Sequence, residues 1–309
     1  MSEKRPFGKT GFHVSSHGFG GAPSAFLKTD APAVARMIEG LLDNGMNLID
    51  TAMSYPGNEE FIGNHLAHRR GDFVLVSKCG ERPPGSEAPA WSEAAIAFAV
   101  DRALRLLKTD HVDVMLLHSC DLATLEKGEA IGALVKAREA GKIKFAGYSG
   151  DNEALAYAAG HAELAVLETS INIVDQKNID LGLPIAEKNG KGVIAKRPVA
   201  NACWKELSQQ PGMYAKYAAG YTERLKKMNL TPADLGYTGD ANAAWPEIAL
   251  RFTLSQPGVS TAIVGTTNPA NAANNQRVAA MGPLDDAVVQ KIRDAFHRAD
   301  PNGEWKGET

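Results

Sequence analysis

The chain is poor in cysteine, has little excess charge of either sign, and lacks long apolar runs. Its 309 residues include three cysteines, Cys79, Cys120 and Cys203, which form neither a C-x-x-C pair nor a zinc motif. Such sparse cysteines favour a reducing compartment. The net charge of −3 gives no general attraction to nucleic acid. No run approaches the roughly 20 apolar residues of a membrane span, so we expect neither a nucleic-acid nor a membrane partner.

The N-terminal residues 1–6 lack the apolar core of a secretory signal. Together with the cysteine usage, this predicts a cytoplasmic location. A hydrophobic content of 44% and a charged content of 22% are typical of a globular protein with a substantial core. The histidines and cysteines form no convincing ligand set, so no metal site is expected.

Short apolar runs alternate with longer amphipathic segments. Because most of these runs are continuously apolar, they indicate parallel strands covered on both sides. We expect strands near 14–20, 47–51, 73–78, 112–118, 145–149, 165–170, 192–196 and 261–265. The expected helices span 31–43, 58–68, 92–107, 122–140, 153–160, 179–188, 269–281 and 285–298. This alternation predicts an α/β fold, a (β/α)₈ TIM barrel in one domain covering 1–309.

Two stretches interrupt the alternation. One is the proline-rich loop 81–91, and the other is an insertion at 201–245 before the last strand, within which 213–228 is expected to be helical. Both follow strands of the predicted barrel, so both should lie at its C-terminal face, where barrel enzymes bind substrate. Trp91 and Trp204, with Trp245 as a further candidate, should therefore form walls of a substrate pocket.

Four polar residues stand where strand-like runs end. Asp50 ends the run 46–50, Tyr55 follows five residues later, Lys78 ends the run 72–78, and His118 ends the run 112–118. Strand ends of a barrel meet at one mouth, so we expect one proton-transfer site. Each residue alone has an ordinary interpretation as a helix cap, a rim charge or a packing residue. Their combination at strand ends favours the catalytic interpretation.

These residue types have a specific use together. A neighbouring ammonium lowers the pKa of a phenol from its ordinary value of about 10. Lys78 can supply this charge to Tyr55, and Asp50 can keep Lys78 protonated by pairing with it. Tyr55 would then be a general acid, and His118 would orient a substrate carbonyl. No serine or cysteine nucleophile with a partner base accompanies this group, so a hydride from a bound cofactor fits the reaction.

On these residues the chain resembles the aldo-keto reductase family. Residues 50–55 read D-T-A-M-S-Y, which matches the family's D-T-A-x-x-Y, while S-K at 77–78 and L-L-H-S at 116–119 match its lysine and histidine segments. Segments 8–15, 141–149 and 257–266 extend the similarity over nearly the whole chain. The resemblance implies an N-terminal β-hairpin and reversible, metal-free, NADPH-dependent reduction of an aldehyde or ketone, with NADH as the alternative cofactor. It assigns Tyr55 as the acid, His118 as the substrate-orienting residue, and Lys78 and Asp50 as tuners.

The same resemblance implies a cofactor site, and there the chain departs from the family pattern. Ser149-Gly150 replaces a usual Ser-Asn pair, Glu168 replaces a Gln, and Lys196-Arg197 occupies the place of an aromatic residue. The last loop has no Arg or Lys to hold a 2′-phosphate, which should weaken the preference for NADPH over NADH. The other cofactor candidates are Gly20, Gly21, Asp50, Gly265, Thr266, Thr267, Asn271 and Asn275, the last two at positions that usually face the adenine.

Two alternative functions remain open. The altered contacts at Gly150, Glu168 and Lys196 would also fit a regulatory barrel that senses the nucleotide with little turnover. A Schiff-base lyase with Lys78 or Lys196 as the nucleophile would need no nicotinamide. The expected partner in the leading hypothesis is a small-molecule carbonyl or alcohol.

Overall fold

Parallel strands form a closed barrel in the computed structural model, which describes residues 4–27, 29–210, 212 and 214–308. Within this described part, eight strands close in the order β10-β3-β4-β5-β6-β7-β8-β9. They are β3 (His17–Gly20), β4 (Leu48–Asp50), β5 (Val74–Cys79), β6 (Val112–His118), β7 (Ile143–Ser149), β8 (Leu164–Ser170), β9 (Gly192–Lys196) and β10 (Thr261–Val264). An antiparallel hairpin of β1 (Lys4–Pro6) and β2 (His13–Ser15) precedes them. The predicted (β/α)₈ TIM barrel with an N-terminal β-hairpin is confirmed.

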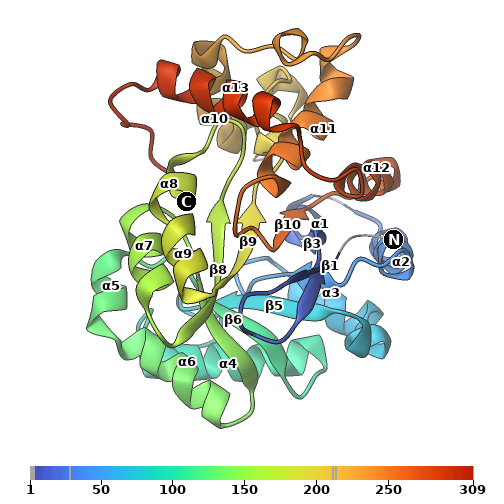
Figure 1. Ribbon diagram of the computed structural model, residues 1–309. Coiled ribbons are helices and arrows are strands. Elements are labelled where there is room, and N and C mark those ends of the chain that lie inside the picture. The colour runs from blue at the N-terminus through green and yellow to red at the C-terminus, as the bar shows by residue number, and fades with distance from the viewer. Residues whose placement is uncertain (1–3, 28, 211, 213, 309) are drawn as a thin grey trace.

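Helices surround this barrel (Figure 1). Those that follow its strands are α1 (Ala22–Phe26), α2 (Ala31–Asp43), α3 (Asn58–His65), α4 (Glu93–Leu107), α5 (Leu122–Lys127), α6 (Glu129–Glu139), α7 (Asn152–Gly160), α8 (Lys177–Leu181), α9 (Leu183–Asn189) and α12 (Pro269–Ala279). Ser92 caps α4 as its sequence position predicts, with Oγ accepting from the Ala95 amide. The helix predicted at 122–140 is divided between α5 and α6, because Gly128 adopts a left-handed φ of 76°.

A second group of helices lies over β8 and β9 in Figure 1. It consists of α10 (Tyr214–Met228), α11 (Ala241–Leu254) and α13 (Asp286–Ala299), which share a separate apolar cluster. The prediction of a helix at 213–228 is confirmed over 214–228, while residue 213 lies outside the described residues. The helix α11 was not predicted, because Pro246 lies inside it and proline normally interrupts a helix.

The barrel interior is a packed apolar column. Inward-facing side chains such as Val76, Leu116 and Val166 pack there together with Phe7 and Val14 of the hairpin. Side chains alternate between the two faces of a strand, so the next inward position lies two residues further along. At the C-terminal ends of several strands, the next inward side chain is polar. These polar side chains form the floor of the barrel mouth.

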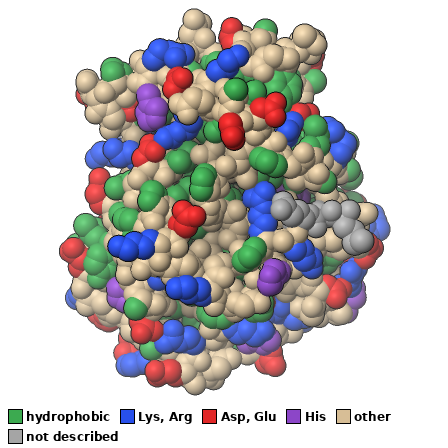
Figure 2. Space-filling view, viewed as in Figure 1, with side chains coloured by type: hydrophobic (Ala, Val, Ile, Leu, Met, Phe, Trp, Pro, Cys, Tyr) green, Lys and Arg blue, Asp and Glu red, His purple; other side chains and the backbone are tan. Residues whose placement is uncertain are grey.

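The outer surface carries interspersed acidic and basic side chains on the face shown in Figure 2. Over the described ranges, none of the helices has both the length and the apolar character that crossing a membrane requires. All three cysteines are buried as free thiols.

Candidate active site

The strand alternation brings the predicted polar residues to one place. Asp50 lies two residues after inward-facing Leu48, Lys78 after Val76, and His118 after Leu116. Ser149 ends β7 and Lys196 ends β9, while Glu168 lies two residues after inward-facing Val166, near the end of β8. The floor of the mouth is therefore a ring of the last inward side chains of successive strands.

Lys78 is the centre of this floor. Its side chain is fully buried, and Nζ lies 2.6 Å from both carboxylate oxygens of Asp50 and 3.1 Å from the Thr51 carbonyl oxygen. Nζ also lies 3.3 Å from Glu168 Oε2. One ammonium thus serves two buried carboxyl groups.

The charges within this cluster shift its pKa values in a consistent way. Burial alone would lower the pKa of Lys78, but the charges of Asp50 and Glu168 outweigh it and hold that pKa above its usual range. The pKa of Asp50 lies well above its ordinary value, because burial and the neighbouring Glu168 charge outweigh the attraction of Lys78. Lys78 is therefore a permanent cation, as its pairing with Asp50 predicted.

Tyr55 and His118 lie beside this cluster. The Lys78 ammonium is 5.2 Å from the centroid of the Tyr55 ring. The rings of Tyr55 and His118 meet edge to face at 6.1 Å, and Phe26 packs on Tyr55 at 5.8 Å. The structure thus brings all four predicted catalytic residues together, with both the Tyr55 and the His118 rings half-buried.

The electrostatics of Tyr55 differ from the expected result. Burial raises the pKa of Tyr55 above its usual range, and the charge of Lys78 only reduces that increase. The expectation of a phenol with a lowered pKa is therefore wrong for this state of the protein. The main reason is the burial of the phenol, and the negative charges of Asp50 and Glu168 add to it.

His118 is a neutral imidazole at this site. Burial and the positive charges of Lys78, Lys196 and Arg197 hold its pKa well below its ordinary value. Its Nδ1 lies 3.2 Å from Ser54 Oγ, a contact that no feature of the sequence predicted. A neutral imidazole can donate one hydrogen bond to a substrate oxygen without carrying charge.

Gly150 is a packing requirement of this fold. A Cβ atom at this position would overlap Tyr148 Oη. Tyr148 is buried, and its hydroxyl donates to the Cys120 carbonyl oxygen at 2.8 Å. The large side chain at 148 therefore explains why the usual Asn is absent after Ser149.

Lys196 contacts a buried polar network around Asp151. Its Nζ lies 3.2 Å from Asp151 Oδ2. Asp151 also accepts from Thr169 Oγ1 at 2.7 Å and Asn178 Nδ2 at 2.7 Å. Asp151 is the residue before α7, but its side chain makes no capping bond to that helix. Thr169 and Asn178 hold that carboxylate toward the interior instead.

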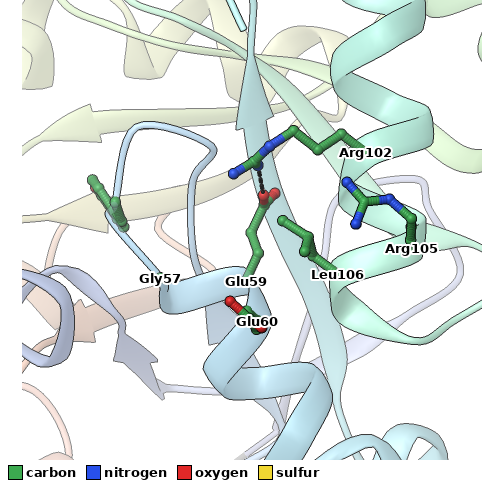
Figure 3. A pocket seen from close by; sticks show the side chains of 7 residues that line it. Gly57, Glu59, Glu60, Arg102, Arg105 and Leu106 are labelled. Atoms are coloured by element: carbon green, nitrogen blue, oxygen red, sulfur yellow. Dashed lines mark hydrogen bonds and ion pairs between the residues drawn. The ribbon is translucent and has the colours of Figure 1, made fainter. Parts of the chain in front are cut away.

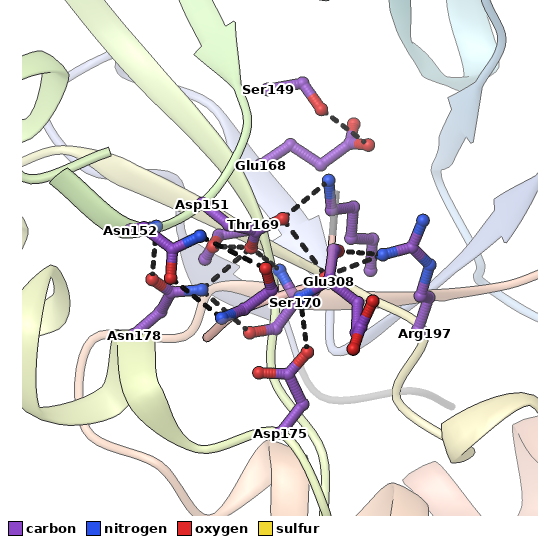
Figure 4. A network of polar contacts seen from close by, with 12 residues as sticks. Ser149, Asp151, Asn152, Glu168, Thr169, Ser170, Asp175, Asn178, Arg197 and Glu308 are labelled. Carbon is purple, nitrogen blue, oxygen red and sulfur yellow. Dashed lines mark hydrogen bonds and ion pairs between the residues drawn. The ribbon is translucent and has the colours of Figure 1, made fainter. Parts of the chain in front are cut away.

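The C-terminal segment closes one side of this network, as Figure 4 shows. Arg197 donates to Ser170 Oγ at 3.1 Å and to the Glu308 carbonyl oxygen. The Glu308 amide donates to Asp175 Oδ2 at 3.0 Å. Arg197 is therefore occupied by the chain's own segment in this structure.

The glycine-rich part of the predicted cofactor site is tightly packed. A Cβ at Gly21 would overlap Asn58 Oδ1, and one at Gly265 would overlap Pro23 Cδ. A Cβ at Gly20 would lie 3.3 Å from the Gly265 amide nitrogen. These three glycines thus let the ends of β3 and β10 approach each other and the starts of α1 and α3 closely.

The predicted nucleotide loop precedes α12 as expected. Asn268 caps this helix, with Oδ1 accepting from the Ala270 amide at 2.9 Å. Thr266 and Thr267 are partly exposed and Asn271 is exposed, whereas Asn275 is buried. This loop offers hydroxyl and amide groups beside the N-terminus of an eleven-residue helix.

The three tryptophans considered for the substrate pocket are placed differently from one another. Trp91 is half-buried and packs against Gly80, at the end of β5. Trp204 stacks on Trp245 at a centroid distance of 6.0 Å. Trp245 is 4% exposed and belongs to the apolar cluster under α10, α11 and α13, so it is a core residue and not a pocket wall.

A separate small pocket opens between α3 and α4 (Figure 3). Glu59 and Arg102 lie on its wall, joined by an ion pair at 2.6 Å. Neither Lys78 nor His118 lines it, although Tyr55 borders it. This pocket is therefore not the centre of the proton-transfer group.

The floor of the mouth leaves one buried acceptor for a ligand. Glu168 Oε1 accepts from Ser149 Oγ at 3.2 Å, while Oε2 accepts no hydrogen bond from the residues described. A carboxamide donates through its NH₂ group, so a nicotinamide amide fits this acceptor. The Glu168 carboxylate is thus compatible with the nicotinamide cofactor that the sequence predicts.

Comparisons with known proteins agree with this arrangement. The profile of the Aldo/keto reductase family matches residues 18–296. The chain is 27% identical to the uncharacterized oxidoreductase YqkF of Bacillus subtilis, over 94% of this chain and 95% of that protein. It is also 27% identical to L-galactose dehydrogenase of Arabidopsis thaliana, over 92% of this chain and 89% of that protein. The holo form of aldo-keto reductase AKR11C1 from Bacillus halodurans superposes with a TM-score of 0.78 at 27% identity, covering 96% of each chain.

Proposed function

Because this chain belongs to the aldo/keto reductase family and is therefore an oxidoreductase, we propose that it reduces an aldehyde or ketone with NADPH, or oxidises the corresponding alcohol in reverse. The observation that supports this most strongly is the joint placement of Lys78, Tyr55 and His118 beside one another in the barrel mouth. When bound, the nicotinamide cofactor supplies the hydride.

In this proposal the chain's own residues manage the proton. Tyr55 Oη donates a proton to the substrate oxygen as negative charge develops there. His118, neutral because its pKa is lowered, donates a hydrogen bond that fixes the carbonyl. Lys78 stabilises the phenolate that remains, and Asp50 holds Lys78 in position through two contacts of 2.6 Å.

The cofactor would be held by groups around the same mouth. Glu168 Oε2, which pairs with Lys78 at 3.3 Å but accepts no hydrogen bond from the residues described, is the proposed acceptor for the carboxamide. Ser149 orients that carboxylate. Thr266 and Thr267 would contact a 2′-phosphate near the start of α12, with Gly265 giving close backbone approach. Asn271 and Asn275 stay candidates for the adenine side, and Gly20, Gly21, Gly150, Lys196 and Arg197 stay candidates for the nicotinamide side.

The preference between the two dinucleotides should be modest. An exposed guanidinium or ammonium beside the 2′-phosphate usually creates a strong preference for NADPH. Residues 265–268 offer no such charge, so NADH should also bind. The substrate pocket would lie above Tyr55 and His118, with Trp91 and Trp204 proposed as walls, and the location in the cell is proposed to be the cytoplasm.

The two alternative functions have different support. A regulatory barrel with little turnover is consistent with Lys196 and Arg197 being engaged by Asp151 and Glu308. A Schiff-base lyase needs a neutral amine, but Lys78 has a raised pKa and two carboxylate partners. The structure therefore favours the nucleotide-dependent functions over the lyase.

A fluorescence titration with NADPH and NADH, followed by a panel of aldehydes and ketones, tests the proposal. We expect both dinucleotides to bind and at least one carbonyl class to be reduced with consumption of the cofactor. Binding without turnover across the panel would favour the regulatory alternative. Absence of binding by either dinucleotide would contradict the proposal.

A further inference from the structure

Glu168 is the acidic group of the mouth whose charge has no dedicated cation. Its nearest cation is Lys78 Nζ, at 3.3 Å, which already lies 2.6 Å from both oxygens of Asp50. Lys78 thus compensates the Glu168 charge only in part, because it also pairs with Asp50. Glu168 is 2% exposed, so water screens this charge poorly.

The Glu168 oxygen that accepts no hydrogen bond from the described residues lies in the same barrel mouth as the proposed reaction. Oε2 is 3.3 Å from Lys78 Nζ, and Nζ is 5.2 Å from the Tyr55 ring centroid. Hydride transfer requires the donor carbon about 3 to 3.5 Å from the substrate carbon, whose oxygen Tyr55 protonates. Glu168 and Tyr55 both adjoin the Lys78 ammonium, so a hydride donor that serves Tyr55 sits at the same barrel mouth as the Glu168 carboxylate.

The two redox states of a nicotinamide differ in charge at this point. The oxidised ring is a cation, and the reduced ring is neutral. A buried carboxylate attracts the first and gains no such attraction from the second. A glutamine at the same position would offer a hydrogen-bond acceptor of equal reach without the charge.

Resting on the function proposed above, we propose that Glu168 determines which redox state of the cofactor this protein prefers, by favouring the oxidised, positively charged nicotinamide. Lys196, paired with Asp151, and Arg197, which donates to Ser170 and the Glu308 carbonyl, are present in both wild type and Glu168→Gln. Comparing the two proteins therefore isolates the effect of the Glu168 charge. In a mixed pool of the two states, the protein would carry more of the oxidised form than a Glu168→Gln variant would.

The test measures dissociation constants rather than turnover. NADP⁺ and NADPH are titrated separately into wild type and Glu168→Gln by calorimetry. An opposite charge a few ångströms away in a partly buried site changes a binding constant by about ten- to fiftyfold. We therefore expect the ratio of the NADP⁺ to the NADPH dissociation constant to rise at least tenfold in the variant, chiefly through weaker NADP⁺ binding.

Glu59→Gln is the matched control. Glu59 is also a buried glutamate, but its charge is neutralised by Arg102 at 2.6 Å on the outer side of β5. Its substitution should change the ratio less than twofold. An equal change in both variants would overturn the inference, as would an unchanged ratio in Glu168→Gln.

The dissociation constants of the wild-type protein alone provide a second test. NADP⁺ should bind at least as tightly as NADPH, and a tenfold preference for NADPH would overturn the role of Glu168 even if Glu168→Gln failed to fold. If folded wild type bound neither form, the proposed function would fail as well. If wild type bound both forms but preferred NADPH tenfold, the role of Glu168 would fail and the proposed function would stand.

Discussion

Lys78 Nζ lies 2.6 Å from each carboxylate oxygen of Asp50, inside a barrel where neither side chain is more than 1% exposed. A cation in this position can act on Tyr55 only because its own charge is fixed by a partner. The same pairing makes Lys78 a structural residue, since two carboxyl groups depend on it.

Lys78→Met should therefore destabilise the protein as well as remove activity. It leaves Asp50 and Glu168 buried without their cation, which typically costs about 3 to 5 kcal/mol of unfolding free energy. The loss should be smaller under acidic conditions, because protonated carboxyl groups need no cation. Urea denaturation at two pH values checks this, with exposed Lys188→Met as the control. If Lys78→Met were as stable as wild type at neutral pH, the two buried carboxyl groups would not depend on the Lys78 cation.

The pH dependence of carbonyl reduction should be flat across the neutral range. Tyr55 has a pKa above its usual 10.0, so it stays protonated and able to donate in alkaline buffer. His118 has a pKa well below 6.5, so it stays neutral and contributes no inflection there. We expect kcat/KM for reduction to change less than about threefold between roughly pH 6 and 9. An inflection near the ordinary histidine pKa would show that His118 titrates.

Gly150→Ala should destabilise the protein, because the added methyl group would overlap the Tyr148 ring. Overpacking of this kind costs about 1 to 3 kcal/mol. Gly160→Ala, at the end of α7 with open space around it, is the matched control and should be neutral or slightly stabilising. Thermal unfolding of both variants decides the matter, and equal melting temperatures would contradict the packing role of Gly150.

Asp175 should make stability depend on pH. Burial, reinforced by the charge of Asp151, raises its pKa from 3.8 to about 6. The protonated form is thus favoured in the folded state, so its stabilising effect is complete below about pH 4 and is lost as the pH rises through 6. Asp175→Asn should gain up to about 3 kcal/mol relative to wild type between these limits. If the unfolding free energies of wild type and Asp175→Asn differed by the same amount at every pH, Asp175 would not be the source of a pH-dependent stability.

Much of the fold and part of the site could be predicted from the sequence. The continuous apolar runs located all eight barrel strands, because parallel strands buried on both faces leave a strong local pattern. Asp50, Lys78 and His118 could be placed at one mouth because each follows an inward-facing apolar residue by two positions.

Other features depend on contacts between distant residues. The missing Asn at 150 is explained by Tyr148 only once Tyr148 Oη is seen to occupy that space. The pKa direction of Tyr55 could not be predicted, because it depends chiefly on how deeply the fold buries the phenol, with smaller contributions from the charges of Asp50 and Glu168. The helix α11 was missed because local preference at Pro246 disagrees with the tertiary packing that stabilises it.

The central claim is that the Tyr55 hydroxyl supplies the proton, and Tyr55→Phe tests it most directly. Phenylalanine retains the ring that packs on Phe26 and His118, so folding and NADPH affinity should stay within about threefold of wild type. Under single-turnover conditions, carbonyl reduction should slow at least about hundredfold, the usual contribution of a general acid. A Tyr55→Phe protein that binds NADPH and reduces its substrate at the wild-type rate would contradict the account.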